Sequence, residues 1–379
     1  MKKKYLLYSL FLTIVAAIST SCDDWTETEA EVFPESPTSD AYYASLRNFK
    51  NTKHQVTFGW FGGWSGKGAY MKNSLAGIPD SVDIVSIWDN GLQLSEEKKR
   101  DMEFVQKVKG TKIVFCRILK NVGDGFTPAS VTEGLEPNSA EYRKAVNDFW
   151  GYPEDESNEE AADEAIRKYA RAVIDSLNFY GYDGFDIDYE PHAGPHYGNL
   201  IKQNGDCNHF DVFLEELGKH IGPESGTDRL LIIDGEPQSM TSQPELGKYF
   251  NYFVIQSYRA SSDSNLDARL LGGPGAYRTG LMQTFGEALG EERVTNMTIM
   301  TENFEAVDAA MNGGYGYQDR WGNRMMSLEG FARWQPSNGF AKGGVGTYHM
   351  EAEFGTNPNY KNMRKAIQIM NPSSNALIK

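Results

Sequence analysis

The sequence predicts an α/β fold, a single (β/α)8 TIM barrel, and three observations support this class. Eight short apolar runs are spaced along the chain, with segments of helical periodicity between them. Several runs are continuously hydrophobic, as expected for parallel strands that are covered on both faces. The chain beyond residue 50 is long enough for one such barrel, and no internal repeat or low-complexity linker divides it.

The eight expected strands are short and follow one another through the whole barrel segment. They are 56–60, 82–88, 112–118, 184–190, 230–234, 252–258, 296–301 and 343–349. Between them, Ser95 is expected to cap a helix that runs to Gly110. The clearest helix is 158–180, where apolar residues follow helical spacing and Gly181 ends the pattern. Similar patterns occur at 210–221 and 362–369.

The fourth expected strand carries three acidic residues, Asp186, Asp188 and Glu190, each two positions from the next. A strand places such residues on one face, about 6.5–7 Å apart along the chain, and leaves an apolar opposite face. Glu190 is the last residue before Pro191, at the carboxyl end of the strand, where chemistry is found in this fold. Like charges in such a row are costly unless they share protons or serve a reaction.

Three non-catalytic interpretations of these acids remain open. They could form a solvated edge strand, although edge strands rarely alternate acids with Phe, Ile and Tyr. They could bind calcium or magnesium, but an EF-hand loop requires a turning backbone with glycine at its sixth position. They could also be a buried acidic cluster without a chemical purpose. The extended, alternating pattern favours catalysis.

The segment DGFDIDYE, residues 183–190, resembles the signature of glycoside hydrolase family 18, Asp-Gly-x-Asp-x-Asp-x-Glu. That family includes chitinases and endo-β-N-acetylglucosaminidases, and it uses the acetamido group of the substrate as nucleophile. The resemblance implies that Glu190 is the general acid and later the base. It implies that Asp188 orients the acetamido group and that Asp186 shares a proton with Asp188. No metal or organic cofactor is needed.

Residues at other strand ends add candidate substrate contacts. Gln256 and Tyr258 resemble the Gln-x-Tyr of the endo-β-N-acetylglucosaminidase branch, in which the tyrosine binds the acetamido carbonyl and the glutamine lines the same subsite. An ordinary strand-end tyrosine is the alternative.

Glu236 is expected to bind sugar hydroxyls or to be a solvated loop charge. Tyr348 or His349 is expected to form the floor of the site. Trp88 is expected to stack on a sugar or to pack in the core, and the same two roles are open for Trp60 and Trp64.

The third strand departs from the chitinase pattern. Chitinases usually carry Ser-x-Gly-Gly there, and residues 116–119 read Cys-Arg-Ile-Leu. The sequence therefore favours an endo-β-N-acetylglucosaminidase that cuts the GlcNAc-β1,4-GlcNAc core of an N-linked glycan or glycoprotein. A chitinase and a catalytically weak glycan-binding lipoprotein are the alternatives. Loops 199–205, 260–276 and 311–323 are expected to select the glycan class.

The first 50 residues are expected to lie outside the barrel. Residues 1–22 have a lysine-rich start and a short apolar stretch, which is typical of a secretory signal peptide, and Cys22 resembles a lipidated lipoprotein cysteine. Residues 23–50 form an acidic tether with a short helix at 40–49, and residues 51–379 form the barrel. An outer-membrane lipoprotein at the cell surface is the favoured localisation, and a plain periplasmic or secreted protein is the alternative.

The charge balance excludes one class of partner. The formal net charge is −15, and the loss of Lys2, Lys3 and Lys4 with the signal peptide makes it about −18. Such a chain does not bind nucleic acid by counterion release, whereas a neutral N-acetylated sugar is compatible with it. Cys116 and Cys207 remain after processing, and both are expected to be free thiols, since a chain of this length needs no disulfide to build a core.

Overall fold

The structure is a computed structural model that describes residues 39–68, 71–155, 157–192, 198–201, 209–273 and 279–372. The chain divides into two compact units, residues 1–44 and 45–379. Of the first unit, residues 39–44 are described; they contain the start of helix α2 (Asp40–Lys50), so the helix expected at 40–49 is confirmed. Cys22, the expected signal peptide, most of the expected tether and Cys207 lie outside the described residues.

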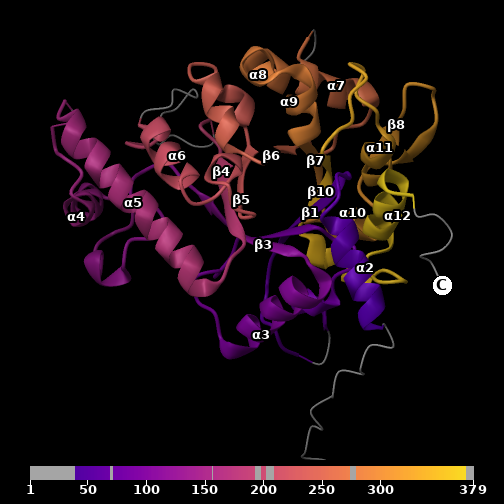
Figure 1. The fold of residues 1–379 in the computed structure, drawn as a ribbon, viewed down its shortest axis with the longest axis horizontal. Coiled ribbons are helices and arrows are strands. Elements are labelled where there is room, and N and C mark those ends of the chain that lie inside the picture. Colours follow the sequence, from indigo (N-terminus) through magenta and orange to yellow (C-terminus); the bar gives the residue numbers. More distant parts are fainter. Residues whose placement is uncertain are drawn as a thin grey trace, which may run out of the picture. The chain divides into compact units, whose positions relative to one another are not determined.

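The second unit is built on a closed barrel of eight strands, which confirms the predicted fold (Figure 1). The strand order around the barrel is β1-β10-β7-β6-β5-β4-β3-β2, and every neighbouring pair is parallel. All eight strands overlap expected runs, although β7 begins two residues later than expected and Glu190 and Tyr258 lie just beyond the ends of β4 and β6. Their bounds are β1 Val56–Phe61, β2 Ile84–Ile87, β3 Lys112–Ile118, β4 Gly184–Tyr189, β5 Leu230–Gly235, β6 Tyr252–Gln256, β7 Thr298–Asn303 and β10 Gly344–Tyr348.

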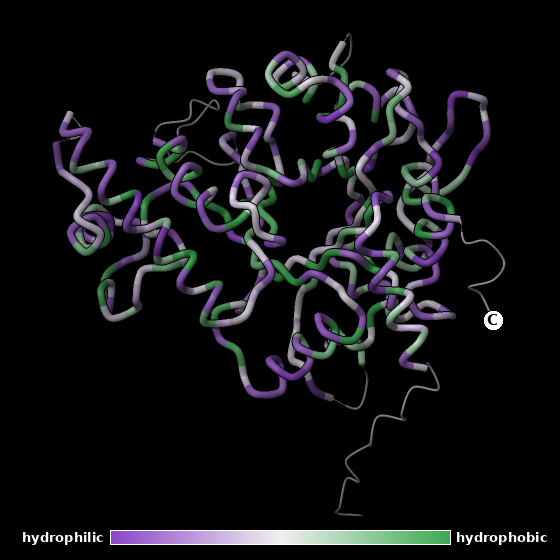
Figure 2. Tube along the Cα trace, in the orientation of Figure 1, coloured by the Kyte–Doolittle hydropathy of each residue, from purple (hydrophilic) through white to green (hydrophobic). Residues whose placement is uncertain are grey.

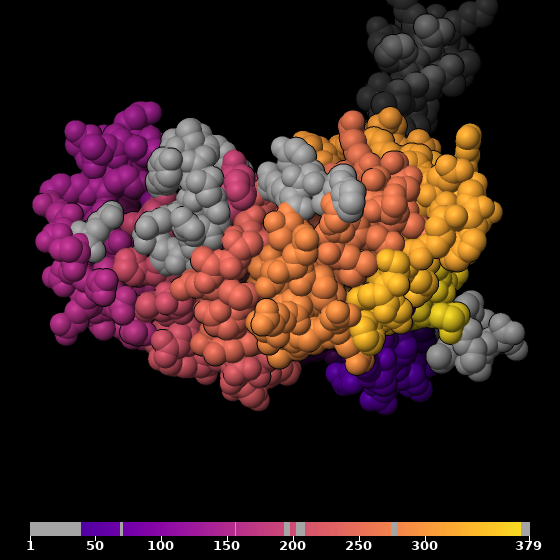
Figure 3. All heavy atoms as spheres, turned by 90° about the horizontal axis from the view of Figure 1, so that it is seen from above, coloured from indigo at the N-terminus to yellow at the C-terminus, as the bar shows by residue number. Residues whose placement is uncertain are grey.

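Helices follow the strands and form the outer layer. They are α3 Glu96–Phe104, α4 Ala140–Trp150, α5 Glu159–Tyr180, α6 Phe210–Gly218, α7 Asp263–Leu271, α8 Leu281–Leu289, α9 Glu291–Met297, α10 Val307–Asn312, α11 Ser327–Arg333 and α12 Lys361–Met370. On the side drawn in Figure 3, the segments of this layer follow one another in chain order, from magenta through orange to yellow. Hydrophilic and hydrophobic stretches alternate along the helices, as expected for elements with one buried face (Figure 2).

Helix α5 positions the acidic strand, and the sequence explains its limits. The side chain of Asn158 accepts a hydrogen bond from Ala161 N at the first turn, and Gly181 ends the helix with a φ of 80°. A glycine in the left-handed conformation often ends a helix, because it has no Cβ atom and so no steric penalty there. The apolar positions expected to face inward are all buried, and β4 begins three residues after Gly181. The expected cap is also confirmed at α3, where Ser95 Oγ accepts from Lys98 N at 3.3 Å.

Two apolar cores lie on the two faces of the strands. One lies inside the barrel and contains alternate strand residues such as Phe58, Trp60 and Ile232. The other lies between the strands and the helices, and it contains Phe185 and Ile187 of β4. The intervening residues of β4 must therefore face the barrel interior, because successive strand residues point to opposite sides. This alternation is what aims Asp186 and Asp188 inward.

Two segments expected to be loops contain regular structure. Residues 311–323 include β8 (Gly316–Gln318), which pairs antiparallel with β9 (Arg324–Met326). Residues 260–276 include α7. A strand of three residues is too short for an alternating pattern to be detected, which explains why the hairpin was not predicted. Both segments lie in connections that follow the carboxyl ends of β6 and β7, so they lie on the same side of the barrel as Glu190.

Asp101 is expected to be essential for the stability of the segment between β1 and α3. Its carboxylate accepts from Trp64 Nε1 at 2.8 Å, Ser74 Oγ at 2.6 Å, Leu75 N at 2.7 Å and Ala76 N at 2.9 Å. Each oxygen accepts from two of these donors, so an Asp101→Asn variant places an amide donor against two other donors, and we expect it to lose about 2–4 kcal/mol of unfolding free energy. Urea unfolding measures the change.

The matched control is Asp148→Asn on the exposed side of α4, where the aspartate forms an ion pair with Lys144. That change should alter the unfolding free energy by less than about 0.5 kcal/mol. Equal effects of the two substitutions would contradict the structural role of Asp101.

Candidate active site

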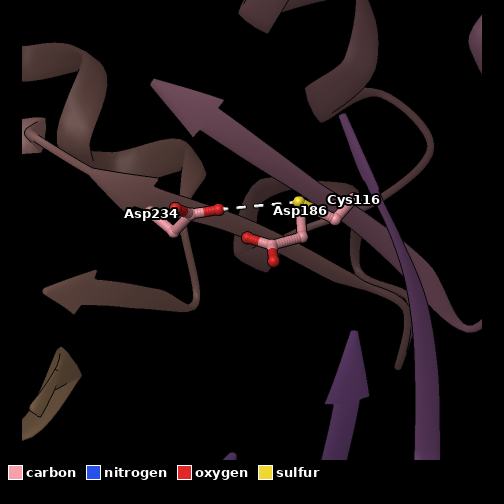
Figure 4. A group of neighbouring side chains, drawn as sticks. All are labelled: Cys116, Asp186 and Asp234. Carbon is pink, nitrogen blue, oxygen red and sulfur yellow. Dashed lines mark hydrogen bonds between the residues drawn. The ribbon is translucent and has the colours of Figure 1, made fainter. Parts of the chain in front are cut away.

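The register of three neighbouring strands brings acidic side chains together inside the barrel. Cys116 of β3 lies opposite Asp186 of β4, and Asp188 of β4 lies opposite Asp234 of β5. Asp186 is 0% exposed and Asp234 is 1% exposed. The side chains of Cys116, Asp186 and Asp234 point toward one another from their separate strands (Figure 4).

Asp186 is held by two fixed donors on one of its oxygens. Its Oδ2 accepts from Trp60 Nε1 at 3.1 Å and from Ser86 Oγ at 2.6 Å. Burial raises the pKa of Asp186 to about 6, although these hydrogen bonds and that of Asp234 act in the opposite direction. Among the described residues, no fixed donor reaches its other oxygen, Oδ1.

Asp188 lies next along the same face and is more strongly perturbed. Burial, with the charges of Glu190 and Asp186, raises the pKa of Asp188 to about 8. That Asp186 and Asp188 share a proton stays a prediction; the acid hydrogen-bonded to Asp186 is Asp234 of the neighbouring strand. Neighbouring strands approach more closely than alternate residues of one strand, which is why the carboxyl group of Asp234 reaches Asp186.

Glu190 follows β4 directly and is linked to β6 by a glutamine. Gln256 Nε2 donates to Glu190 Oε1 at 3.1 Å and to Asp234 Oδ1 at 3.2 Å. The structure therefore brings Gln256 into the same site as the acids, and its amide connects the acid of β4 with the carboxyl group of β5. Burial raises the pKa of Asp234 well above its usual range, with the charges of Asp188 and Asp186 acting in the same direction.

Aromatic rings lie beside these acids. Tyr258 stacks on Tyr348 with ring centroids 6.2 Å apart, and Trp88 lies 5.7 Å from Tyr348. His349 contacts both Tyr348 and Trp88, and its backbone is left-handed with a φ of 55°. Tyr258, Tyr348 and Trp88 are thus brought together, and their contacts with substrate stay predictions. Burial and the charges of Asp234 and Asp188 raise the pKa of Tyr258, so its hydroxyl group remains a donor.

The other two tryptophans that were considered for sugar stacking are buried in the protein. Trp60 is 3% exposed and donates to Asp186, while Trp64 is 4% exposed and donates to Asp101. Core packing, which was the alternative for both, is therefore the observed role. Trp60 nevertheless contributes to the site through its indole N–H.

Glu236 lies just beyond β5 and contacts a residue from the loop that follows β4. Its Oε2 is 2.6 Å from His192 Nδ1, and its backbone N–H donates to Tyr189 O at 2.9 Å. Its side chain is 17% exposed. This glutamate is therefore partly buried and held at the end of β5 by contact with a histidine, while its binding of sugar hydroxyls stays a prediction.

One group of three side chains has ligand atoms close enough together for a metal ion, among the residues that the structure describes. Cys116, Asp186 and Asp234 each offer one atom, and these atoms lie within 4.8 Å of one another. However, burial and the charges of Asp186 and Asp234 raise the pKa of the Cys116 thiol well above its usual range, which disfavours the thiolate form that binds metals. Protons shared within the cluster suit these groups better than a cation.

Sequence reasoning missed Asp234 and Ser86 as site residues. Asp234 was passed over in favour of Glu236, although the alternation that points Ile232 inward also points Asp234 inward. Ser86 is a single hydroxyl residue within an otherwise apolar strand, and it is 0% exposed. A polar residue at an inward position of a buried strand was the available signal in both cases.

Comparisons with known proteins agree with this geometry. Residues 21–369 match the profile of glycoside hydrolase family 18, BT1044-like. A glutamate-to-glutamine variant of BT1044 in its selenomethionine form is 32% identical, with a TM-score of 0.71 over 89% of this chain and 94% of that chain. An endo-β-N-acetylglucosaminidase from Cordyceps militaris has the same fold, with 21% identity and a TM-score of 0.56 over 88% of this chain and 96% of that chain.

A curated relative is similar over part of its length. Endo-β-N-acetylglucosaminidase EndoS from Streptococcus pyogenes serotype M1 is 27% identical over 226 residues, which are 55% of this chain and 22% of that protein. The profile match covers most of the chain and includes the acidic strand. The chain therefore belongs to glycoside hydrolase family 18, in its BT1044-like group.

Proposed function

We propose that the protein is an endo-β-N-acetylglucosaminidase that hydrolyses the GlcNAc-β1,4-GlcNAc core of N-linked glycans by substrate-assisted, retaining catalysis. The observation that carries the proposal is the hydrogen bond from Gln256 to Glu190, with Tyr258 two residues further along and stacked on Tyr348. Two features support it: the departure from Ser-x-Gly-Gly at the end of β3, and the similarity to a relative named as such an enzyme.

In the proposed reaction, Glu190 protonates the glycosidic oxygen while the bond from that oxygen to the anomeric carbon breaks. The acetamido oxygen of the same sugar forms a bond to the anomeric carbon, which gives an oxazolinium ion. Asp188 holds the acetamido N–H and balances the positive charge that develops there. Water then adds to the anomeric carbon and gives a proton to Glu190, which restores the acid, while the bond from that carbon to the acetamido oxygen breaks and the acetamide is regenerated.

Removal of the Tyr258 hydroxyl group is expected to weaken the attack by the acetamido oxygen. In this mechanism the hydroxyl group donates to that oxygen, and burial keeps Tyr258 protonated. We expect Tyr258→Phe to lower kcat by about 10- to 100-fold, the range for one hydrogen bond to a charged group. Steady-state kinetics on a fluorescent glycan–asparagine substrate measures the loss. An unchanged kcat would show that the tyrosine only packs against Tyr348.

A direct comparison of substrates tests the proposed specificity. The wild type is given a glycan–asparagine with a chitobiose core and, in parallel, a chitin tetramer, and kcat/KM is measured for each. We expect the glycan–asparagine to be cut faster by at least about 100-fold, since the unmodified tetramer lacks the branched mannose. Faster cleavage of the tetramer would identify a chitinase. Binding of the glycan without cleavage would identify a glycan-binding protein.

We further propose, from the sequence alone, that Cys22 is lipidated and anchors the protein to the outer membrane at the cell surface. Within the described parts of the chain, no helix has the length and apolarity required to cross a bilayer. We expect Cys22→Ser to move the full-length protein from the membrane fraction to the soluble fraction of a Gram-negative host. An unchanged fractionation would contradict lipid anchoring.

A further inference from the structure

Asp234 is a buried carboxyl group surrounded by other acids. It is buried near three other acids, namely Asp186 and Asp188 of β4 and Glu190 directly after it, and it contacts two polar neighbours, Cys116 of β3 and Gln256 of β6. A fourth negative charge in this space would be costly, because buried like charges raise each other's energy. A proton on one or more of these groups relieves that cost.

The hydrogen bonds around Asp234 indicate which of its oxygens carries the proton. Its Oδ1 accepts from Gln256 Nε2 at 3.2 Å, which suits a carbonyl oxygen. Its Oδ2 is left with a single weak contact, 3.7 Å from Cys116 Sγ. A hydroxyl group at Oδ2 therefore loses no strong donor and is free to donate.

Asp186 offers the matching acceptor. Its Oδ2 already accepts from Trp60 and Ser86, while no fixed donor within the described residues reaches its Oδ1. Asp234 lies within hydrogen-bonding reach of Asp186, and their nearest ligand atoms belong to a group that spans at most 4.8 Å. A proton on Asp234 would give Asp186 its third hydrogen bond.

We propose that Asp234 is a neutral carboxylic acid in the resting protein, which donates its proton to Asp186 and accepts from Gln256. In this arrangement Asp186 is the ionised member, stabilised by three donors. The amide of Gln256 is fixed between a neutral carbonyl oxygen and Glu190. Asp234 is thus a positioning residue: it acts on the reaction through Asp186 and Gln256 and touches no reacting atom. The kinetic consequence rests on the proposed function, while the protonation state does not.

The test compares two substitutions at one position. Asparagine reproduces a neutral acid, because its carbonyl oxygen accepts from Gln256 and its amide group donates to Asp186. Alanine removes both bonds. We expect Asp234→Asn to keep kcat within about threefold of the wild type, and Asp234→Ala to lower it by about 10- to 100-fold. The acid limb of the kcat/KM profile should move to higher pH in Asp234→Ala alone, because Asp186 has lost a donor to its charged form.

The groups that face Asp234 all affect this pH profile: Asp186 and Asp188 of β4, Glu190 just after β4, Cys116 of β3, and Gln256 and Tyr258 from the β6 segment. Equal losses and equal shifts in Asp234→Asn and Asp234→Ala would overturn the proposal, since the negative charge of Asp234 would then be what matters.

Infrared spectroscopy gives a readout that needs no substrate. The difference between the wild type and Asp234→Asn near neutral pH should show the carbonyl stretch of one protonated carboxylic acid, absent from the variant. A lost carboxylate band would overturn the proposal even if the protein cuts N-glycans. The protonated band would support it even if no glycan is cut. The folding control is Asp101→Asn, where donors surround the aspartate: that change should destabilise the protein, while Asp234→Asn should not.

Discussion

A Glu190→Gln variant is expected to lower kcat by about 10²- to 10⁴-fold, the range that positioned general acids contribute. Glutamine has the shape of glutamate and keeps a carbonyl oxygen for the hydrogen bond from Gln256 Nε2. It has no proton to give to the glycosidic oxygen. KM should stay within about threefold of the wild type, because the substrate contacts of the site remain.

Glu224→Gln is the matched control for this prediction. Glu224 is exposed and lies before β5, at the opposite end of the barrel from Glu190. The Glu224→Gln substitution makes the same chemical change as Glu190→Gln and should leave kcat unchanged. A loss in Glu190→Gln of less than about tenfold would mean that another group supplies the proton.

An Asp188→Asn variant is expected to lower kcat by about 10²- to 10³-fold, similar to the removal of one preorganised group that stabilises a developing charge. The amide group can still contact the acetamido nitrogen, but it cannot balance the positive charge of the oxazolinium ion. The loss should therefore appear in kcat more than in KM. A variant with lost affinity and an unchanged kcat would assign Asp188 to binding alone.

For the same variant we also expect a change in thermal stability that depends on pH. The pKa of Asp188 is about 8 in the folded protein against 3.8 as its ordinary value, so the folded state binds more protons between those values. Stability contributed by Asp188 therefore falls as pH rises from about 4 to about 8, and the difference is constant above that range. The Asp188→Asn variant has no ionisable group at this position, so it lacks this loss of stability at high pH. Its Tm should exceed that of the wild type at pH 8, and the difference should shrink toward pH 4.

The barrel strands could be predicted because each is a run of apolar residues covered on both faces. In β4, the alternation of Phe185, Asp186, Ile187 and Asp188 indicated both the strand and the face that carries the acids. The hairpin β8–β9 could not be predicted, since each of its strands has three residues, too few for an alternating pattern.

The candidate site was predicted where one segment contains its residues and was incomplete where several strands meet. Asp186, Asp188 and Glu190 follow from a single alternating strand. Asp234 became evident as a partner of Asp186 only once the register of β4 and β5 was known. The two hydrogen bonds of Gln256 likewise depend on how β6 lies beside β5. Distances between strands are set by the closed barrel, and the sequence of one strand does not contain them.

The most direct test of the account is intact-mass spectrometry of a glycoprotein with a single N-glycan, incubated with the wild type and with Glu190→Gln. The account predicts a product that retains one GlcNAc on asparagine with the wild type, and the unchanged glycoprotein with the variant. Loss of the complete glycan, or no change with the wild type while chitin oligomers are cut, would contradict it.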